Sequence, residues 1–176
     1  MKTKDDRWAK QFGDFAENMV MYVLGQMKNM SVAIIDHVGA DIIASRRDDV
    51  VKRYAISVKG RNFPENESKS YNFSQDNIDK LIETSKVFDM IPAVAFVFVD
   101  NMEGARKIRM FVITLEDMMN MCKDETPFLN FAKDGITFKY TEGKKVHNLT
   151  EIKANKKIDY TELEFTQLGN KADFGC

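Results

Sequence analysis

One apolar segment constrains the fold more than any other part of the chain. Residues 92–99 (Pro-Ala-Val-Ala-Phe-Val-Phe-Val) carry no charged side chain and no side chain that forms hydrogen bonds, and Asp100 follows directly. The run is too short to cross a membrane, and its β-branched and aromatic residues favour a strand. Because both faces of this strand are apolar, both must be covered. This is typical of a sheet that has other layers packed against each face.

Periodicity and turn residues predict the elements around this strand. We expect helices over 4–28, 74–88 and 114–122, and strands over 31–36, 40–44, 53–59 and 106–114. Ser74 and Thr114 are typical N-cap residues. Residues 61–73 indicate a loop, and residues 135–141 and 144–149 indicate a hairpin. This order predicts an α/β fold with a central mixed β-sheet flanked by helices and a small β-rich C-terminal extension.

The length and composition fit one globular domain with an appendage. The chain has 176 residues, of which 44% are hydrophobic and 30% charged. We place the core in residues 1–125 and an extension of unknown role, packed on the core, in residues 126–176. The two cysteines are too few for a disulfide framework, and the N-terminal segment lacks the apolar stretch of a signal peptide. We therefore expect a cytoplasmic protein that does not associate with membranes.

The net charge limits the kinds of partner. The sum of 26 basic and 27 acidic residues is −1, which excludes indiscriminate coating of nucleic acid but allows a local basic site. Basic residues are concentrated within residues 46–61, and they are Arg46, Arg47, Lys52, Arg53, Lys59 and Arg61. We expect them to contact phosphates. The alternative is that residues 46–53 form a solvated hairpin tip.

One group of residues remains once familiar signatures are excluded. The sequence has no glycine-rich phosphate loop and no Cys-x-x-Cys pair, and its two histidines make a zinc site or a serine triad improbable. Ser57 and Lys59 share one face of a predicted strand, and Asp41 lies on the neighbouring antiparallel strand. Glu17 lies at the edge of the first helix's apolar stripe. Carboxylates beside a lysine suit metal-assisted phosphodiester hydrolysis, because Mg²⁺ prefers oxygen ligands and lysine stabilises developing negative charge.

The sequence around these residues resembles a known nuclease superfamily. The segments are Gly13-Asp-Phe-Ala-Glu17, Val38-Gly-Ala-Asp-Ile-Ile43 and Tyr54-Ala-Ile-Ser-Val-Lys-Gly-Arg61. Together with the following helix and apolar strand, they resemble the PD-(D/E)XK core, and in particular its archaeal Holliday-junction resolvase branch. The resemblance implies that the central mixed β-sheet flanked by helices is restriction-endonuclease-like. The resemblance covers about the first two-thirds of the chain. It implies an endonuclease acting on DNA, with branched or structured DNA as a candidate substrate, and a homodimer.

The resemblance also implies a role for each matching residue. Glu17 and Asp41 would bind Mg²⁺ or Mn²⁺, and the backbone carbonyl of Val58 would complete the metal shell. Lys59 would be the catalytic lysine. Gln75 resembles a glutamine that some family members place on the helix after the third strand, where it touches the site.

One position departs from the family pattern. Ser57 stands where the family has glutamate, and a neutral hydroxyl does not replace the lost charge. Some members take the missing carboxylate from a neighbouring helix, and the candidates here are Glu67, Asp76, Asp79 and Glu83. We favour Asp79, which lies one turn after Gln75. The alternative function is a catalytically inactive nuclease-fold protein that binds nucleic acid or a protein partner.

Each candidate also has a simpler interpretation when taken alone. Asp41 is compatible with a turn aspartate, Lys59 with an exposed strand-end lysine, and Glu17 with a solvated helix face. The aromatic residues of the first helix, Trp8, Phe12 and Phe15, are predicted to belong to the hydrophobic core.

Overall fold

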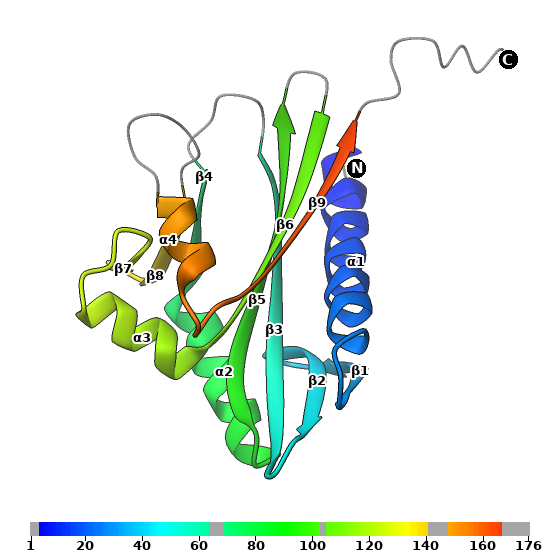
Figure 1. Cartoon of the computed structure of the whole chain (residues 1–176), viewed down its shortest axis with the longest axis vertical. Coiled ribbons are helices and arrows are strands. Elements are labelled where there is room, and N and C mark those ends of the chain that lie inside the picture. The colour runs from blue at the N-terminus through cyan, green and yellow to red at the C-terminus, as the bar shows by residue number, and fades with distance from the viewer. Residues whose placement is uncertain (1–3, 64–68, 103–104, 141–147, 167–176) are drawn as a thin grey trace, which may run out of the picture.

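A six-stranded mixed sheet forms the centre of the molecule (Figure 1). The computed structural model describes residues 4–63, 69–102, 105–140 and 148–166. The sheet has the order β1-β2-β3-β5-β6-β9, and its strands are β1 (Met30–His37), β2 (Ala40–Arg47), β3 (Val51–Phe63), β5 (Ile91–Met102), β6 (Ala105–Thr114) and β9 (Asp159–Thr166). Strands β3 and β5 are parallel, and every other neighbouring pair is antiparallel.

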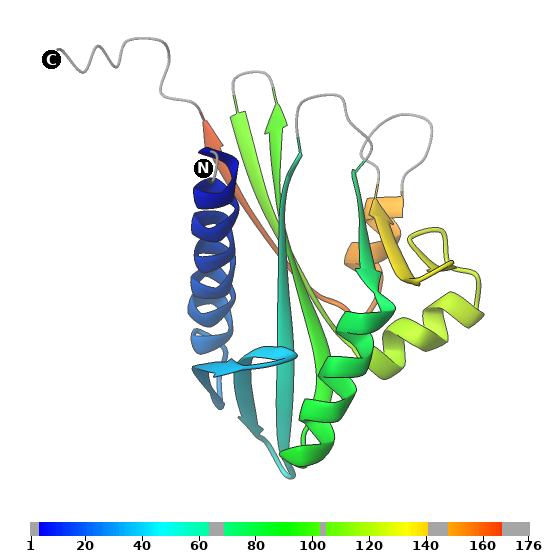
Figure 2. The same cartoon turned by 180° about the vertical axis from the view of Figure 1, so that it is seen from behind.

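Different layers cover the two faces of this sheet. Helix α1 (Lys4–Gly25) lies on one face. On the other face lie α2 (Gln75–Val87), α3 (Leu115–Lys123), α4 (Asn148–Ala154) and a second sheet, and Figure 2 shows this arrangement from behind. The second sheet has the order β4-β8-β7, with β4 (Lys69–Ser74), β8 (Gly135–Tyr140) and β7 (Leu129–Ala132). The prediction of an α/β fold with a central mixed sheet flanked by helices is confirmed.

Strand β5 is buried on both sides, as its sequence predicts. Val94, Phe96 and Phe98 join the cluster beneath the second sheet. The alternate residues Ala93, Ala95 and Val97 face α1 and join a second cluster. The ring of Phe96 stacks on that of Phe138 in β8, with 5.0 Å between the ring centroids. Each fully buried phenylalanine contributes about 1.5–3 kcal/mol, so this layer is a main source of stability.

Helix α1 packs closely on β3, and a glycine permits this approach. A Cβ atom at Gly60 would lie 2.8 Å from Cε1 of Phe12 and 3.0 Å from Cβ of Ala16. The strand continues through Gly60 to Phe63, so the expectation that Gly60 ends it is wrong. Trp8 and Phe15 are 59% and 38% exposed, so their predicted place in the core is also wrong. The apolar stripe of α1 is wider than the part of the helix that contacts the sheet.

Local capping fixes the two helices that follow strands. The hydroxyl oxygen of Ser74 accepts a hydrogen bond from the Asn77 amide at 3.3 Å, and Thr114 accepts one from the Asp117 amide at 3.1 Å. Both predicted N-caps are confirmed. The turn between β1 and β2 packs on α2, because Gly39 adopts φ +95° and a Cβ there would lie 2.4 Å from the Lys80 carbonyl oxygen. This contact positions the start of β2.

Long-range pairing changes the predicted boundaries elsewhere. The expected loop at 61–73 contains the end of β3 and all of β4, and β4 pairs with the distant strand β8. The expected hairpin of 135–141 with 144–149 is wrong for Asn148 and Leu149, which begin α4, while residues 141–147 lie outside the described residues. Within the described ranges, no helix combines the length and apolar character that crossing a membrane requires.

Candidate functional site

The first component of the candidate site is Asp41, at the point where β2 separates from β3. The ladder between these strands ends at the pair Ile42–Ile56. Beyond it, the Val58 amide donates a hydrogen bond to Oδ2 of Asp41 at 2.6 Å. The Ser57 hydroxyl donates to the same oxygen at 3.4 Å. The Asp41 carboxylate therefore accepts the hydrogen bond that a backbone carbonyl of β2 would accept if the ladder continued. This bond holds Asp41 against β3.

The second component lies on β3 beside Asp41. Continuing the register places Asp41 opposite Ser57, and side chains that face each other across a pair point to the same side of the sheet. Lys59 lies two residues after Ser57, so it shares this side. Ser57 is 2% exposed and Lys59 is half-buried. Ile56 and Val58 point to the opposite side and pack in the cluster with α1.

The third component is Glu17 on α1. Its carboxyl group is half-buried, and burial raises its pKa above the ordinary value. The negative charge of Asp41 raises the pKa further, whereas the positive charge of Lys59 lowers it. Glu17 therefore lies within electrostatic reach of both residues. Helix α1 covers the face opposite to Ser57 and Lys59, so Glu17 approaches Asp41 from the other side of the sheet. It does so beside the part of β3 beyond the end of the ladder with β2, which we call the open edge of β3.

The electrostatics of this group suit a bound cation. Two partly buried carboxylates repel each other, and a cation relieves both the repulsion and the cost of burial. Among the described residues, no group of three or more His, Cys, Asp or Glu side chains is arranged to hold a metal. Mg²⁺ commonly uses only one or two carboxylates and keeps several waters. Glu17 and Asp41, with the Val58 carbonyl, therefore fit Mg²⁺ better than a metal that requires a full protein cage.

Two of the four acids proposed to replace the missing glutamate have other partners. Asp79 accepts a hydrogen bond from the Gln75 side chain at 2.8 Å, and both are exposed on α2. Asp76 pairs with Lys80 at 2.6 Å. Glu83 is exposed, and Glu67 lies outside the described residues. The roles of Gln75 and Asp79 in the site stay predictions.

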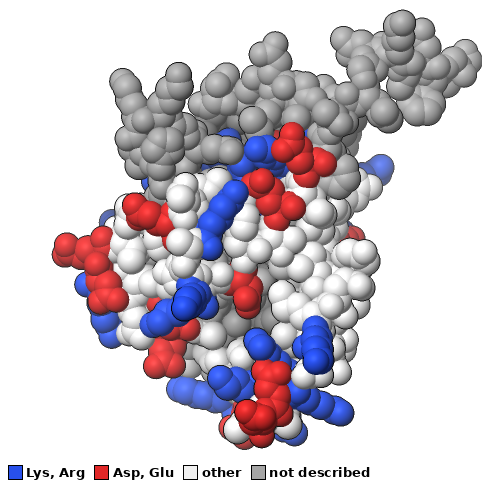
Figure 3. Space-filling view, in the orientation of Figure 1, with Lys and Arg blue, Asp and Glu red and all other residues white. Residues whose placement is uncertain are grey.

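The basic residues form two separate groups. Arg46, Arg47 and Arg53 lie near the turn of the β2–β3 hairpin, and five residues of strand, about 16 Å, separate Arg46 from Asp41. Arg46 pairs with Asp48 at 2.6 Å, and Figure 3 shows basic and acidic side chains mixed at this lower end of the molecule. Arg61 lies nearer, two residues after Lys59, and its Nη1 donates to the Ser70 carbonyl at 3.4 Å.

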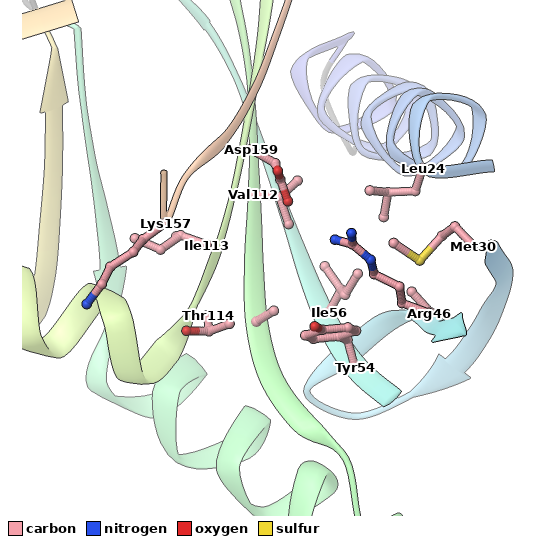
Figure 4. Close-up of a pocket in the computed structure, with 12 residues that line it drawn as sticks. Leu24, Met30, Arg46, Tyr54, Ile56, Val112, Ile113, Thr114, Lys157 and Asp159 are labelled. Atoms are coloured by element: carbon pink, nitrogen blue, oxygen red, sulfur yellow. The ribbon is translucent and has the colours of Figure 1, made fainter. Parts of the chain in front are cut away.

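A small pocket adjoins the hairpin and not Asp41. In Figure 4 the Arg46 guanidinium points into it, with Tyr54, Leu24, Met30 and Asp159 around it. Burial raises the pKa of the Tyr54 hydroxyl above its ordinary value. The pocket measures about 90 Å³, which is the share of about three water molecules in the liquid. This volume is too small for a nucleotide.

A buried ionic cluster on the same sheet was missed by sequence reasoning. The Arg109 guanidinium pairs with Asp100, and its Nε lies 2.8 Å from Oε2 of Glu162. The Tyr140 hydroxyl donates to Asp100 at 2.7 Å. Burial alone raises the pKa of Glu162, but hydrogen bonds from Tyr160 and Arg109 and the nearby positive charges lower it to about 2. The charge of Asp100 directly after an apolar strand is the one sequence signal of this cluster.

Comparison with known proteins gives a distant structural likeness. No family model matches the sequence, and no curated protein matches it. The Holliday junction resolvase Hjc of Archaeoglobus fulgidus, an archaeal hyperthermophile, superposes with a TM-score of 0.48 and 14% identity. The alignment covers 72% of this chain and 88% of the resolvase. A likeness of this degree identifies neither a family nor an activity.

Proposed function

We propose that this protein is a metal-dependent endonuclease that hydrolyses DNA phosphodiester bonds at the open edge of β3. The observation that carries the proposal is the placement of two carboxylates near Lys59: the Val58 amide and the Ser57 hydroxyl hold Asp41 against β3, and burial together with the charge of Asp41 raises the pKa of Glu17. Such a pair of carboxylates next to a lysine is typical of a site that works with a cation.

Each residue of the candidate site has a separate role in this proposal. Glu17 and Asp41, with the carbonyl of Val58, would hold Mg²⁺ or Mn²⁺. When bound, the metal supplies an activated water and neutralises charge on the phosphate. Ser57 and the Val58 amide both donate to Oδ2 of Asp41, which leaves Oδ1 for the cation. Lys59 orients the attacking water and stabilises the charge that develops on the phosphate oxygens.

Substrate and assembly follow from the sequence resemblance. Branched or otherwise structured DNA is the proposed substrate, and Arg61 is placed to contact its phosphates beside Lys59. A homodimer is the proposed assembly, because a two-fold enzyme presents two sites to a two-fold substrate.

The position of Ser57 favours one competing function. A catalytically inactive nuclease-fold protein that binds nucleic acid or a protein partner would tolerate a serine in place of a third carboxylate. The lack of a cluster of three acids among the described residues agrees with this alternative.

The deciding experiment measures cleavage of a four-way DNA junction and of plasmid DNA with Mg²⁺, with Mn²⁺ and with EDTA. We expect Asp41→Asn to lower the metal-dependent rate by about 10²–10³-fold, because it removes one of the two carboxylates that would hold the metal and so the charge stabilisation the metal would supply. Asp48→Asn is the matched control, since Asp48 is exposed at the hairpin turn and should change the rate little. DNA binding without cleavage under every metal condition would favour the inactive alternative.

A further inference from the structure

An aromatic groove runs between α1 and the sheet, on the opposite flank of α1 from Glu17. It encloses about 480 Å³, and its walls are Trp8, Gln11, Phe12 and Phe15 of α1 and Asn62, Val99, Arg106 and Ile108 of strands β3, β5 and β6. Phe15 and Glu17 are two residues apart on the helix and so point about 200° apart around its axis. The groove is therefore distinct from the candidate metal site.

The groove leaves large aromatic rings in contact with water. Trp8 and Phe15 are well exposed, and the rings of Phe12 and Phe15 lie 5.7 Å apart in a tilted pair. Exposing a tryptophan and a phenylalanine in the same surface hollow gives up the stability that their burial would provide. Such patches commonly mark a binding site.

The size and chemistry of the groove suit a planar ligand with a polar edge. Organic ligand sites typically measure 300–1,000 Å³, have mostly apolar walls and contain a few polar groups. Here Trp8, Phe15 and Ile108 are apolar walls, while the Gln11 amide both donates and accepts hydrogen bonds. Nucleobases combine these two requirements, because each has a π-face for stacking and an edge for hydrogen bonds.

The charges around the groove complement a phosphate backbone. Arg106 lines the groove and is exposed. Arg7 is exposed on α1 one turn before Gln11, so it lies on the same face of the helix. Among the side chains that the structure describes near this end of α1, the acidic one is Asp14. An aromatic surface bordered by cations is the arrangement that binds single-stranded nucleic acid without strong sequence preference.

We propose that the aromatic groove binds unpaired nucleobases of a single-stranded DNA segment, by stacking on Trp8 and Phe15 and by pairing Arg106 with a phosphate. This inference rests on the proposed nuclease function and specifies its substrate as DNA that contains unpaired nucleotides. Lys59 is followed by Gly60, which lies under Phe12. Lys59 and the groove residue Asn62 are about 10 Å apart along β3 but point to opposite faces of the sheet, so a strand that reaches both would pass around the open edge of β3.

Trp8 makes the test specific, because it is the only tryptophan of the chain. The experiment titrates the protein in EDTA with a 12-nucleotide oligothymidylate and records tryptophan fluorescence. We expect saturable quenching, which a fully paired duplex hairpin of equal length reproduces only weakly. Phe15→Ala should weaken binding about 5- to 150-fold, the range for the loss of one stacked base. Arg106→Ala should lower the slope of log K against log salt by about 0.7.

Tyr22→Ala is the matched control. Tyr22 is 66% exposed on the same helix and does not line the groove, so its loss should leave the affinity unchanged. The inference is wrong if oligothymidylate leaves the fluorescence of Trp8 unchanged, or if Tyr22→Ala weakens binding as much as Phe15→Ala. It is also wrong if sedimentation shows that Phe15→Ala converts a dimer into monomers with no change in oligonucleotide binding, because a second copy would then occupy the groove.

The wild-type protein separates failure of this inference from failure of the proposed function. Metal-dependent cleavage of DNA without quenching by oligothymidylate would overturn the inference and keep the nuclease. Quenching that responds to Phe15→Ala and Arg106→Ala, without cleavage under any metal condition, would keep the groove and overturn the nuclease.

Discussion

The central sheet carries two groups of charged residues, and they are built in opposite ways. Asp100, Arg109 and Glu162 form a closed cluster, in which Asp100 and Arg109 are fully buried and each charge meets an opposite charge or a hydroxyl group. Glu17, Asp41 and Lys59 form an open cluster at the edge of β3, where the charges of Asp41 and Lys59 both act on Glu17.

The difference shows how to distinguish structural from functional charges. In the closed cluster the pKa of Glu162 is lowered to about 2, because its neighbours stabilise the charged form. In the open cluster the pKa of Glu17 is raised, because burial and Asp41 destabilise the charged form. A satisfied charge stabilises the fold, whereas the destabilised charge at the edge of β3 is the one for which we propose a bound cation.

The largest expected effect comes from opening the closed cluster. Arg109→Met leaves Asp100 and Glu162 without their shared cation, and the loss of one partner of a buried pair costs about 3–5 kcal/mol. Urea unfolding followed by circular dichroism measures this loss. Arg106→Met, an exposed arginine on the same strand, should change the free energy of unfolding by no more than about 0.5 kcal/mol. A loss below about 1 kcal/mol for Arg109→Met would show that Lys69 and Lys153 compensate for it.

The second-largest effect is the gain in the free energy of unfolding that we expect when Mg²⁺ binds to the open cluster. Mg²⁺ at 100 times its dissociation constant should stabilise the wild type by about 2.7 kcal/mol at pH 7.5. Glu17→Gln should reduce this gain, because it removes one of the two charges that attract the cation. Thermal unfolding with and without Mg²⁺ measures the difference, and Glu116→Gln, an exposed glutamate on α3, is the control. Equal stabilisation of the wild type and Glu17→Gln would separate Glu17 from the metal.

The same variant gives a pH dependence of known sign in EDTA. The folded-state pKa of Glu17 lies above its ordinary value of 4.5. Its contribution to stability is therefore complete below pH 4.5 and is lost as the pH rises through the raised pKa. The stability of Glu17→Gln should fall less than that of the wild type over this window.

The third effect tests how closely α1 holds Glu17 to the sheet. The added methyl group of Gly60→Ala would meet Phe12 and Ala16, which should cost about 1–3 kcal/mol and lift the helix. The matched control is Gly13→Ala on α1, where an added Cβ meets nothing within 4 Å. It should stabilise the protein by about 0.5–1 kcal/mol through helix propensity. If Gly60→Ala is neutral, the close approach of α1 to β3 is not needed.

The smallest effect concerns an exposed ion pair that belongs to neither cluster. Arg46 and Asp48 have side chains that are 51% and 47% exposed, so a double-mutant cycle should give at most about 1 kcal/mol.

Arg46→Ala with Arg47→Ala should weaken DNA binding and lower its salt dependence if both contact phosphates. Unchanged DNA affinity would identify the hairpin tip as a solvated turn.

Sequence patterns predicted the parts of this molecule that depend on local rules. The N-caps at Ser74 and Thr114 need only a hydroxyl at the start of a helical pattern, and both were confirmed. The meeting of Asp41 and Ser57 follows from two adjacent strands and the two-residue period of side chains. The unbroken apolar run of β5 likewise specified a strand that is covered on both faces.

Other parts depend on partners that are distant in the sequence. Strand β4 was expected to be a loop, because its pairing partner β8 lies more than sixty residues away and its two aromatic residues, Tyr71 and Phe73, are too short a pattern among polar neighbours to predict a strand. The buried position of Arg109 requires Asp100 and Glu162, and no local pattern specifies both. Trp8 was assigned to the core because hydrophobicity alone cannot distinguish a buried stripe from a binding surface.

The span of the closed cluster has a consequence for the order of folding. Arg109 and Glu162 are separated by 53 residues, and Glu162 belongs to the last strand of the sheet. Until β9 docks, Arg109 lacks one of its carboxylate partners, and the layer between the two sheets cannot exclude water fully. Closing contacts across such a separation is slow, so docking of β9 should be a late step. A nascent chain that has not yet added β9 would remain a loosely packed intermediate. Docking of β9 would then complete the packing of the fold in one final step.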